Sequence, residues 1–244
     1  MKKTIILLCF IFFKINSNYC QENKELIFNG LGILKVNIST TEVINELETI
    51  LKTKNKEIDK QDIYAYMKNV VDDGTYKKPI ICQLIMNTKD KNKSPFFAPK
   101  CPLVKYYYIK GYKVSDIELV NLELEFYKDT LIEIKCDVTK ELTDAIKLKY
   151  GEGETKIEKK EIKCTYTFNG NSISYEEISM NESWRYKDIH SLIQFSKYYN
   201  SDCKERTLNY ISISKIGAYD MISKCEKEIT YIENQEKLKK LKNF

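Results

Sequence analysis

The sequence of 244 residues predicts an α+β fold, in which antiparallel sheets pack against about three helices. Alternating apolar and polar residues predict several hairpins, and helical spacing with capping residues predicts the helices between them. The order is strand, helices, strands, helix, strands, which differs from the regular alternation of a parallel α/β protein. We expect two hairpin-rich modules, 21–150 and 151–244, either separate or joined in one continuous domain, after a signal peptide at 1–20.

The first twenty residues have the pattern of an export signal. Two lysines precede an apolar run from Ile5 to Phe13, which Lys14 ends. Nine residues are too few to cross a bilayer, which needs about 20, so a cleaved signal peptide is expected, with cleavage near Cys20. The mature chain would then be periplasmic or secreted. The alternative is a lipid on Cys20, although Tyr19 is bulky where bacterial lipoprotein signals have a small residue.

The charge balance bears on the partner. The whole chain has a formal net charge of +5 from 40 basic and 35 acidic side chains, and the signal removes three lysines, leaving 37 against 35. A nucleic-acid-binding protein is expected to concentrate basic charge on one face, so nucleic acid is not expected as a partner. No later segment is long and apolar enough to span a membrane. The expected partner is a protein or a component of the cell envelope.

Six cysteines remain after cleavage, and an even number in an exported chain predicts disulfides. Six cysteines allow 15 connectivities; pairing of neighbours, such as Cys82 with Cys101, is our first expectation. The alternative is that Cys136 and Cys164, at apolar positions of strand patterns, are buried free thiols. Neither zinc-like CxxC spacing nor a second histidine is present, so no metal or cofactor is expected. The six are Cys82, Cys101, Cys136, Cys164, Cys203 and Cys225.

In the first half, residues 33–38 alternate as a half-buried strand. Ser39 and Glu42 have the spacing of a capping box, before a helix with apolar residues from Val43 to Leu51. A second helix is predicted from the stripe between Ile63 and Val71, capped by Asp59. Strands at Ile80–Met86 and Leu103–Ile109 are predicted around an irregular loop.

The second half begins with the clearest strand signal, in which 120–126 and 132–138 alternate around a Lys128-Asp129 turn and predict a hairpin with one wet face. A third helix is predicted from Thr139 to Gly151. Another hairpin is expected around Asn169-Gly170, and strands at 189–199 and 207–214 follow. From Ala218 the chain is a weakly amphipathic helix or tail.

Several stretches together resemble a known group: Gly32 to Asn37 with its capped helix, the strand pair through Lys128-Asp129, the helix end at Lys149-Tyr150-Gly151, and Trp184 before another strand pair. They resemble uncharacterised exported proteins of Bacteroidota-type bacteria and, more remotely, β-lactamase-inhibitor-like and small outer-membrane-assembly lipoprotein modules. The resemblance covers residues 31–215. It implies interaction with proteins or envelope components rather than catalysis.

Catalytic signals are few. His190 is the only imidazole, and neither a nucleophile elbow nor a nucleotide-binding fingerprint occurs. Paired carboxylates are the remaining candidates for catalytic groups, and they would make the protein a secreted hydrolase. Glu123 and Glu125 share one side of a strand at a separation that glycosidases use, but that side is expected to face water. The other acid pairs are Glu133 with Asp137 and Glu176 with Glu177.

Aromatic side chains supply the candidate binding surface. Alternation sends Tyr107 to the side opposite Tyr106 and Tyr108, and Tyr and Trp supply both contact area and a hydrogen bond at interfaces. The candidates are Tyr107, Tyr112, Trp184 and Tyr198. The expected function is therefore an exported, non-enzymatic binding module. The alternatives are an inhibitor or immunity protein against a toxin or hydrolase, and a carboxylate-dependent hydrolase.

Overall fold

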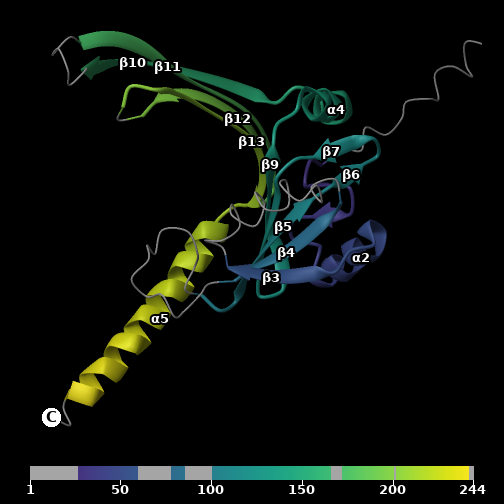
Figure 1. Cartoon of the computed structure of the whole chain (residues 1–244), viewed down its shortest axis with the longest axis vertical. Coiled ribbons are helices and arrows are strands. Elements are labelled where there is room, and N and C mark those ends of the chain that lie inside the picture. Colours follow the sequence, from purple (N-terminus) through teal and green to yellow (C-terminus); the bar gives the residue numbers. More distant parts are fainter. Residues whose placement is uncertain (1–26, 60–77, 86–100, 166–171, 201, 242–244) are drawn as a thin grey trace, which may run out of the picture.

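Nine strands form one large sheet in the computed structural model, which describes residues 27–59, 78–85, 101–165, 172–200 and 202–241. The strand order is β10-β11-β12-β13-β9-β8-β5-β4-β3, and every neighbouring pair is antiparallel except β3 with β4. Two small two-stranded sheets and three helices complete the described part (Figure 1). The predicted α+β class with mainly antiparallel pairing is confirmed.

The strands of the large sheet are β3 (Asn55–Asp59), β4 (Ile80–Ile85), β5 (Val104–Lys110), β8 (Leu122–Tyr127), β9 (Thr130–Asp137), β10 (Glu154–Thr165), β11 (Ser172–Tyr186), β12 (Ile189–Tyr199) and β13 (Glu205–Lys215). The small sheets pair β1 (Gly30–Leu31) with β2 (Leu34–Lys35) and β6 (Tyr112–Val114) with β7 (Ile117–Leu119). The helices are α2 (Glu42–Leu51), α4 (Lys140–Tyr150) and α5 (Ala218–Leu241).

The large sheet crosses the expected module boundary at residue 150. β13, from the second half, pairs with β9, from the first half, so that Ile213 lies opposite Ile134. The two halves of the chain therefore contribute strands to the same sheet. The reason is long-range: β9 and β13 both carry apolar residues on the same side, and pairing them extends one buried surface.

One side of this sheet, here called the core face, is covered by α2, α4 and the small sheets. Leu124 of β8, Ile134 of β9 and Ile213 of β13 are fully buried there, in register with one another. Leu47 of α2 and Ile146 of α4 belong to the same cluster. The period-two pattern of these strands therefore puts their apolar residues on one shared face.

The other side, here called the α5 face, receives the first turns of α5. A bulge between Glu125 and Phe126 adds a residue to β9, and Ile132 packs there against Ala218 and Ile222 of α5. Simple alternation placed Ile132 on the same side as Ile134, so this assignment is corrected. The bulge reverses the side to which Ile132 points.

Two local predictions are confirmed by backbone geometry. Lys128 and Asp129 both have positive φ (47° and 69°), as a two-residue hairpin turn requires. The Thr139 hydroxyl accepts a hydrogen bond from the Leu142 N–H (3.2 Å) and starts α4, and Gly151, with φ of 79°, ends it. These signals are local, since a cap or turn involves only a few neighbouring residues.

The region around α2 differs from the prediction. Asn37 has a φ of 65°, which ends the extended segment, and Ile38 is 67% exposed instead of buried. The helix begins at Glu42 after Thr41, and the Ser39 hydroxyl donates to the Ile33 carbonyl rather than capping it. The apolar stripe predicted for the second helix, Ile63 to Val71, lies outside the described residues, as do the predicted signal peptide and the predicted turn at Asn169-Gly170.

Strands β10 to β13 continue past the point where β9 stops pairing. The last pair with β9 joins Tyr210 to Asp137, and beyond it the four strands form a projection that we call the arm: 157–165, 172–180, 195–199 and 205–209. Figure 1 shows the arm curving away from the body while α5 leaves in another direction. Predicted strands at 189–199 and 207–214 are confirmed here as β12 and β13.

Polar contacts anchor the base of the arm to α4. Glu182 of β11 is buried, forms an ion pair with Lys147 of α4 (2.9 Å), and accepts a hydrogen bond from the Gly153 N–H (2.9 Å). The Trp184 indole donates to the Gly151 carbonyl (3.2 Å). The buried carboxylate is therefore fully engaged, as a stable buried charge requires.

Candidate binding surface on the arm and the alpha5 face

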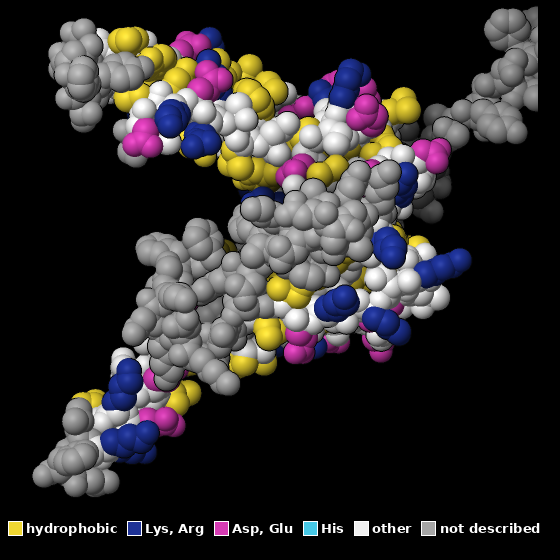
Figure 2. Space-filling view, viewed as in Figure 1, with side chains coloured by type: hydrophobic (Ala, Val, Ile, Leu, Met, Phe, Trp, Pro, Cys, Tyr) yellow, Lys and Arg dark blue, Asp and Glu magenta, His cyan; other side chains and the backbone are white. Residues whose placement is uncertain are grey.

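The arm exposes both sides of its four strands. Cross-strand partners in an antiparallel sheet point to the same side, so the register assigns each arm residue to the core face or the α5 face. Leu208, Ser196 and Ser179 are successive partners on the α5 face, and Phe195 and Met180 are partners on the core face. Figure 2 shows the arm projecting beyond the body, with hydrophobic and charged side chains mixed on its surface.

A band of hydrogen-bonded polar side chains runs along the α5 face from the arm into the body. Ser179 and Ser196 are in contact (3.3 Å), the Gln194 amide donates to Ser196 (3.0 Å), and the Tyr210 hydroxyl donates to Gln194 (2.5 Å). The Lys135 ammonium lies over the Tyr210 ring, 4.4 Å from its centre. The band therefore holds its donors and acceptors in fixed positions.

Within the body the same face carries carboxylates and phenols. The Ser212 hydroxyl donates to Glu133 (2.8 Å), and the Tyr106 hydroxyl is hydrogen-bonded to Glu125. Burial raises the pKa of Tyr106, and the nearby charge of Glu125 raises it further. Burial and Glu133 likewise raise the pKa of Tyr210. Both phenols therefore remain hydrogen-bond donors at neutral pH.

His190 continues this face at the base of the arm. Its cross-strand partners are Arg185 and Ser214, and Ser214 in turn lies opposite Glu133. Burial lowers the pKa of His190, and the charge of Arg185 lowers it further. The imidazole is therefore neutral at pH 7. Cys136 belongs to the opposite, core face, so these two groups are not brought together for nucleophilic catalysis.

Apolar side chains are interspersed with the polar ones on the outer part of the α5 face. Ile173 is 47% exposed, and Tyr198 and Leu208 are each 42% exposed. The Tyr175 and Tyr199 rings stack nearby, with centroids 4.4 Å apart. Aromatic and aliphatic anchors beside fixed hydrogen-bonding groups are the composition of protein interfaces.

The structure places the four aromatic candidates differently from one another. Tyr107 and Tyr112 are buried (6% and 4% exposed), and Tyr107 packs edge to face on Phe126 in the core. Both rings are therefore core residues and do not contribute to a surface. Trp184 is partly buried and packs on Phe28 at the base of the arm. Tyr198 lies on the exposed arm, where a partner can reach it.

The cysteines also depart from the expectation. Cys101 is bonded to Cys225 of α5, which corrects the expected pairing of neighbours Cys82 and Cys101. The structure has buried free thiols at Cys136 and Cys164, as the alternative interpretation predicted. Cys82 is also a buried free thiol, and Cys203 is a half-buried one. Proximity in the sequence predicted the wrong pair because the two cysteines lie in different places in the fold. Cys82 lies inside β4, opposite Tyr108, whereas Cys101 lies before β5, beside α5.

Of the carboxylate pairs named from the sequence, Glu123 is exposed and Glu125 is half-buried, on the same face. The register brings Glu125 opposite Glu133 of the next strand, a pair that the sequence did not single out. The position of the hairpin turn could have predicted the cross-strand partners of β8 and β9. However, the bulge shifts this register by one residue, so that Glu125 lies opposite Glu133. Both carboxylates are engaged by hydroxyl groups of the sheet itself.

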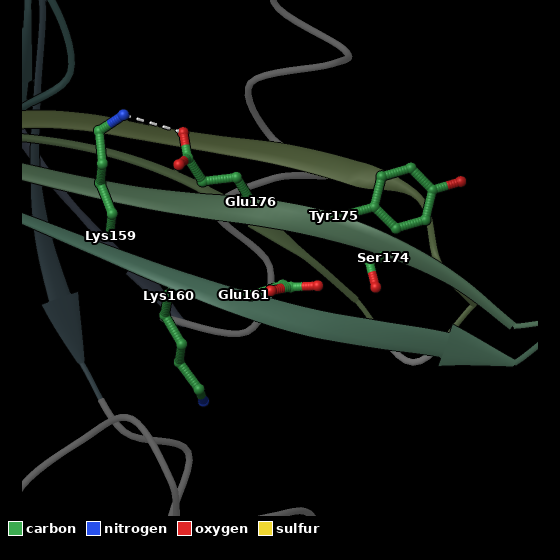
Figure 3. A pocket seen from close by; sticks show the side chains of 6 residues that line it. All are labelled: Lys159, Lys160, Glu161, Ser174, Tyr175 and Glu176. Carbon is green, nitrogen blue, oxygen red and sulfur yellow. Dashed lines mark hydrogen bonds and ion pairs between the residues drawn. The ribbon is translucent and has the colours of Figure 1, made fainter.

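A shallow, open hollow of about 360 Å³ lies at the outer edge of the arm, on the β10–β11 hairpin. Figure 3 shows the Lys159–Glu176 ion pair (3.1 Å) on one side of the strands and Lys160 pointing to the other. The Lys159–Glu176 pair thus satisfies two of the charges that line it. Among the described residues, no group of three or more His, Cys, Asp or Glu side chains is arranged to hold a metal ion.

Comparison with protein families, curated proteins and solved structures gave no match for this chain. Within the described residues, no helix is both long enough and apolar enough to cross a membrane, since the long α5 is rich in Lys and Glu.

Proposed function

We propose that this chain is a non-enzymatic binding protein that acts outside the cytoplasm, and that the α5 face of the arm holds a protein partner. One observation carries the proposal: four strands extend beyond the body with both sides exposed, although each carries apolar residues there. Sheet surface that covers no core contributes little to folding stability. Its exposed apolar residues therefore favour a role in contact with another molecule.

The chemistry of the α5 face favours a protein partner over a polyanion. Glu158, Lys160, Glu177 and Arg206 put both charge signs on this part of the arm, so no concentrated basic stripe forms. Phosphate recognition depends on such a stripe. Leu208 and Tyr198 instead supply the apolar anchors that protein interfaces use.

The disulfide supports the extracytoplasmic part of the proposal. Cys101 and Cys225 join segments far apart in the chain, and structural disulfides persist in oxidising compartments. The sequence resemblance to exported envelope proteins agrees with this location but does not supply a partner.

The proposal is tested by site-specific crosslinking in envelope extracts of the source organism. Photoreactive residues replace Tyr198 or Leu208 on the arm, and Leu148 of α4, which is 91% exposed, serves as the control position. We expect the same protein to be captured from both arm positions and not from the control.

The captured protein is then purified and its affinity is measured directly. Leu208→Asp is expected to weaken binding at least about tenfold, because a charge replaces a contact anchor, whereas Leu148→Asp changes the affinity less than about twofold. Equal losses for the two variants, or no binding by the purified protein, would refute the proposal. A captured enzyme that loses activity on binding would identify the chain as an inhibitor.

A further inference from the structure

Cys164 occupies an unusual position at the tip of the arm. Among the arm side chains that the structure describes, it is the one buried residue (6% exposed), while its neighbours on β10 are exposed or half-buried. It lies on the α5 face, opposite Ile173 of β11. An edge strand that is otherwise in water therefore has one covered position, near its end.

Cys203 provides the cover. It lies in the turn between β12 and β13, and its thiol is within hydrogen-bonding distance of the Cys164 thiol. The Asn200 side chain accepts hydrogen bonds from the N–H groups of Asp202 (3.2 Å) and Lys204 (2.9 Å), and Cys203 is held at a φ of 59°. A left-handed backbone in a non-glycine residue is uncommon and needs such support.

Contacts beside the turn draw β12 toward β11. The Tyr199 N–H donates to the Glu177 carboxylate (3.1 Å), and the Tyr199 ring stacks on Tyr175. These contacts fix the end of β12, next to the turn that contains Cys203, against β11, and β11 in turn pairs with β10, which carries Cys164.

We propose that Cys164 and Cys203 form a second disulfide, which closes the tip of the arm. Bond formation needs the two sulfur atoms to approach to about 2.0 Å, a short movement from hydrogen-bonding contact. The inference is independent of the proposed function, because it concerns the covalent state of the arm and not its partner.

The oxidant is a disulfide of low molecular weight, such as oxidised glutathione. The half-buried Cys203, as thiolate, attacks one sulfur of the donor and expels one donor thiolate, forming a mixed disulfide. Cys164 then loses its proton and attacks the Cys203 sulfur, which expels the second donor thiolate. Two protein thiols are thus oxidised, one donor disulfide is reduced to two thiols, and two protons are transferred.

The other two thiols are excluded as partners by the sheet. Cys82 is opposite Tyr108 on the α5 face of the body, and Cys136 is opposite Ile211 on the core face. Cys136 is excluded because residues on opposite sides of a sheet cannot be bridged without a change of register. Cys82 is on the same side as Cys164, but its strand β4 is separated from β13 by β9, β8 and β5, which is too far for a disulfide. The expected covalent state is therefore two disulfides and two buried thiols.

The test uses the full purified chain, equilibrated in a buffer of reduced and oxidised glutathione in which Cys101–Cys225 is formed. Remaining thiols are blocked with N-ethylmaleimide under denaturing conditions, and the chain is digested and analysed by mass spectrometry without reduction. We expect a Cys164–Cys203 linked peptide, and blocked Cys82 and Cys136. Blocked Cys164 and Cys203, or linkage of either to another cysteine, would overturn the proposal.

A variant separates the bond from general folding. Cys203→Ser changes a half-buried residue and is expected to keep the Cys101–Cys225 bond, to leave Cys164 blocked by the reagent, and to speed hydrogen exchange of the arm amides at least about tenfold. Cys82→Ala is the matched control, in which the Cys164–Cys203 peptide persists. Unchanged arm exchange in Cys203→Ser, despite a linked peptide in the parent, would show that the bond does not close the tip.

Discussion

The bond between Cys101 and Cys225 joins the chain just before β5 to the second turn of α5, across 124 residues of sequence. It holds the helix against the α5 face, where Ile222 packs on Ile132. Beyond the bond, from residue 226 onward, α5 leaves the body and its side chains become mostly exposed. The disulfide therefore marks the end of the docked part of the helix.

Loss of this bond is expected to release α5. Cys225→Ser removes a constraint on a long loop and should lower the free energy of unfolding by about 2–5 kcal/mol. Urea unfolding measures this change, and hydrogen exchange of 218–225 should become faster than exchange in β8 and β9. Cys82→Ala is the control for loss of a thiol without a bond. An unchanged unfolding midpoint in Cys225→Ser would contradict the structural role of the disulfide.

The core face should be sensitive to truncation. Leu124 is fully buried in β8, so Leu124→Ala is expected to cost about 2–5 kcal/mol of stability, from lost burial and the resulting cavity. Leu148 on α4 carries the same side chain at 91% exposure, so Leu148→Ala should change stability by less than about 0.5 kcal/mol. Thermal and urea unfolding compare the two variants. Similar losses would place Leu124 outside the core.

The pKa of His190 predicts a loss of stability in weak acid. Because burial and Arg185 lower the pKa of His190 in the folded state, the unfolded chain takes up a proton first as the pH falls below about 6.5. The free energy of unfolding is therefore unaffected by His190 above that pH. It decreases as the pH falls from about 6.5 toward the pKa that His190 has in the folded state. NMR titration of the single imidazole should give a midpoint below 6.5. His190→Gln should show a smaller decrease in the same pH window, and an equal decrease would assign it to other groups.

The buried thiols should resist alkylation in the folded chain. Burial raises the pKa of Cys82 to about 11 and that of Cys136 to about 12, so neither forms the reactive thiolate at pH 8. Iodoacetamide at pH 8 should label both only after urea is added. Unfolded thiols ionise from about pH 8.5, so the two groups also favour unfolding as the pH rises above that value. Rapid labelling of either one without urea would contradict its burial.

Strand identity was predicted well from residues 120 onward because the signal is local. Alternation defined β12 to its observed bounds, Ile189–Tyr199, and the Lys128-Asp129 turn defined the β8–β9 hairpin. Thr139 and Gly151 bounded α4 for the same reason. Each pattern involves neighbouring residues, and its physical cause acts within one element.

The binding surface was less predictable, and the tyrosines of β5 show why. Alternation correctly separates Tyr107 from Tyr106 and Tyr108, but alternation does not say which side becomes the core. The structure buries Tyr107 among the core residues and leaves Tyr106 and Tyr108 on the α5 face. Which side is covered depends on α2 and α5, and both are distant in sequence from β5.

The amino-acid sequence by itself determined most of the strands, the ends of α4 and the balance of charge, because these follow from periodicity, caps and composition. The tertiary structure alone decided the pairing of β13 with β9, the Cys101–Cys225 bond and the emergence of the arm. These features join segments far apart in the chain. Their free energy comes from surfaces that meet only after folding, so no local pattern encodes them.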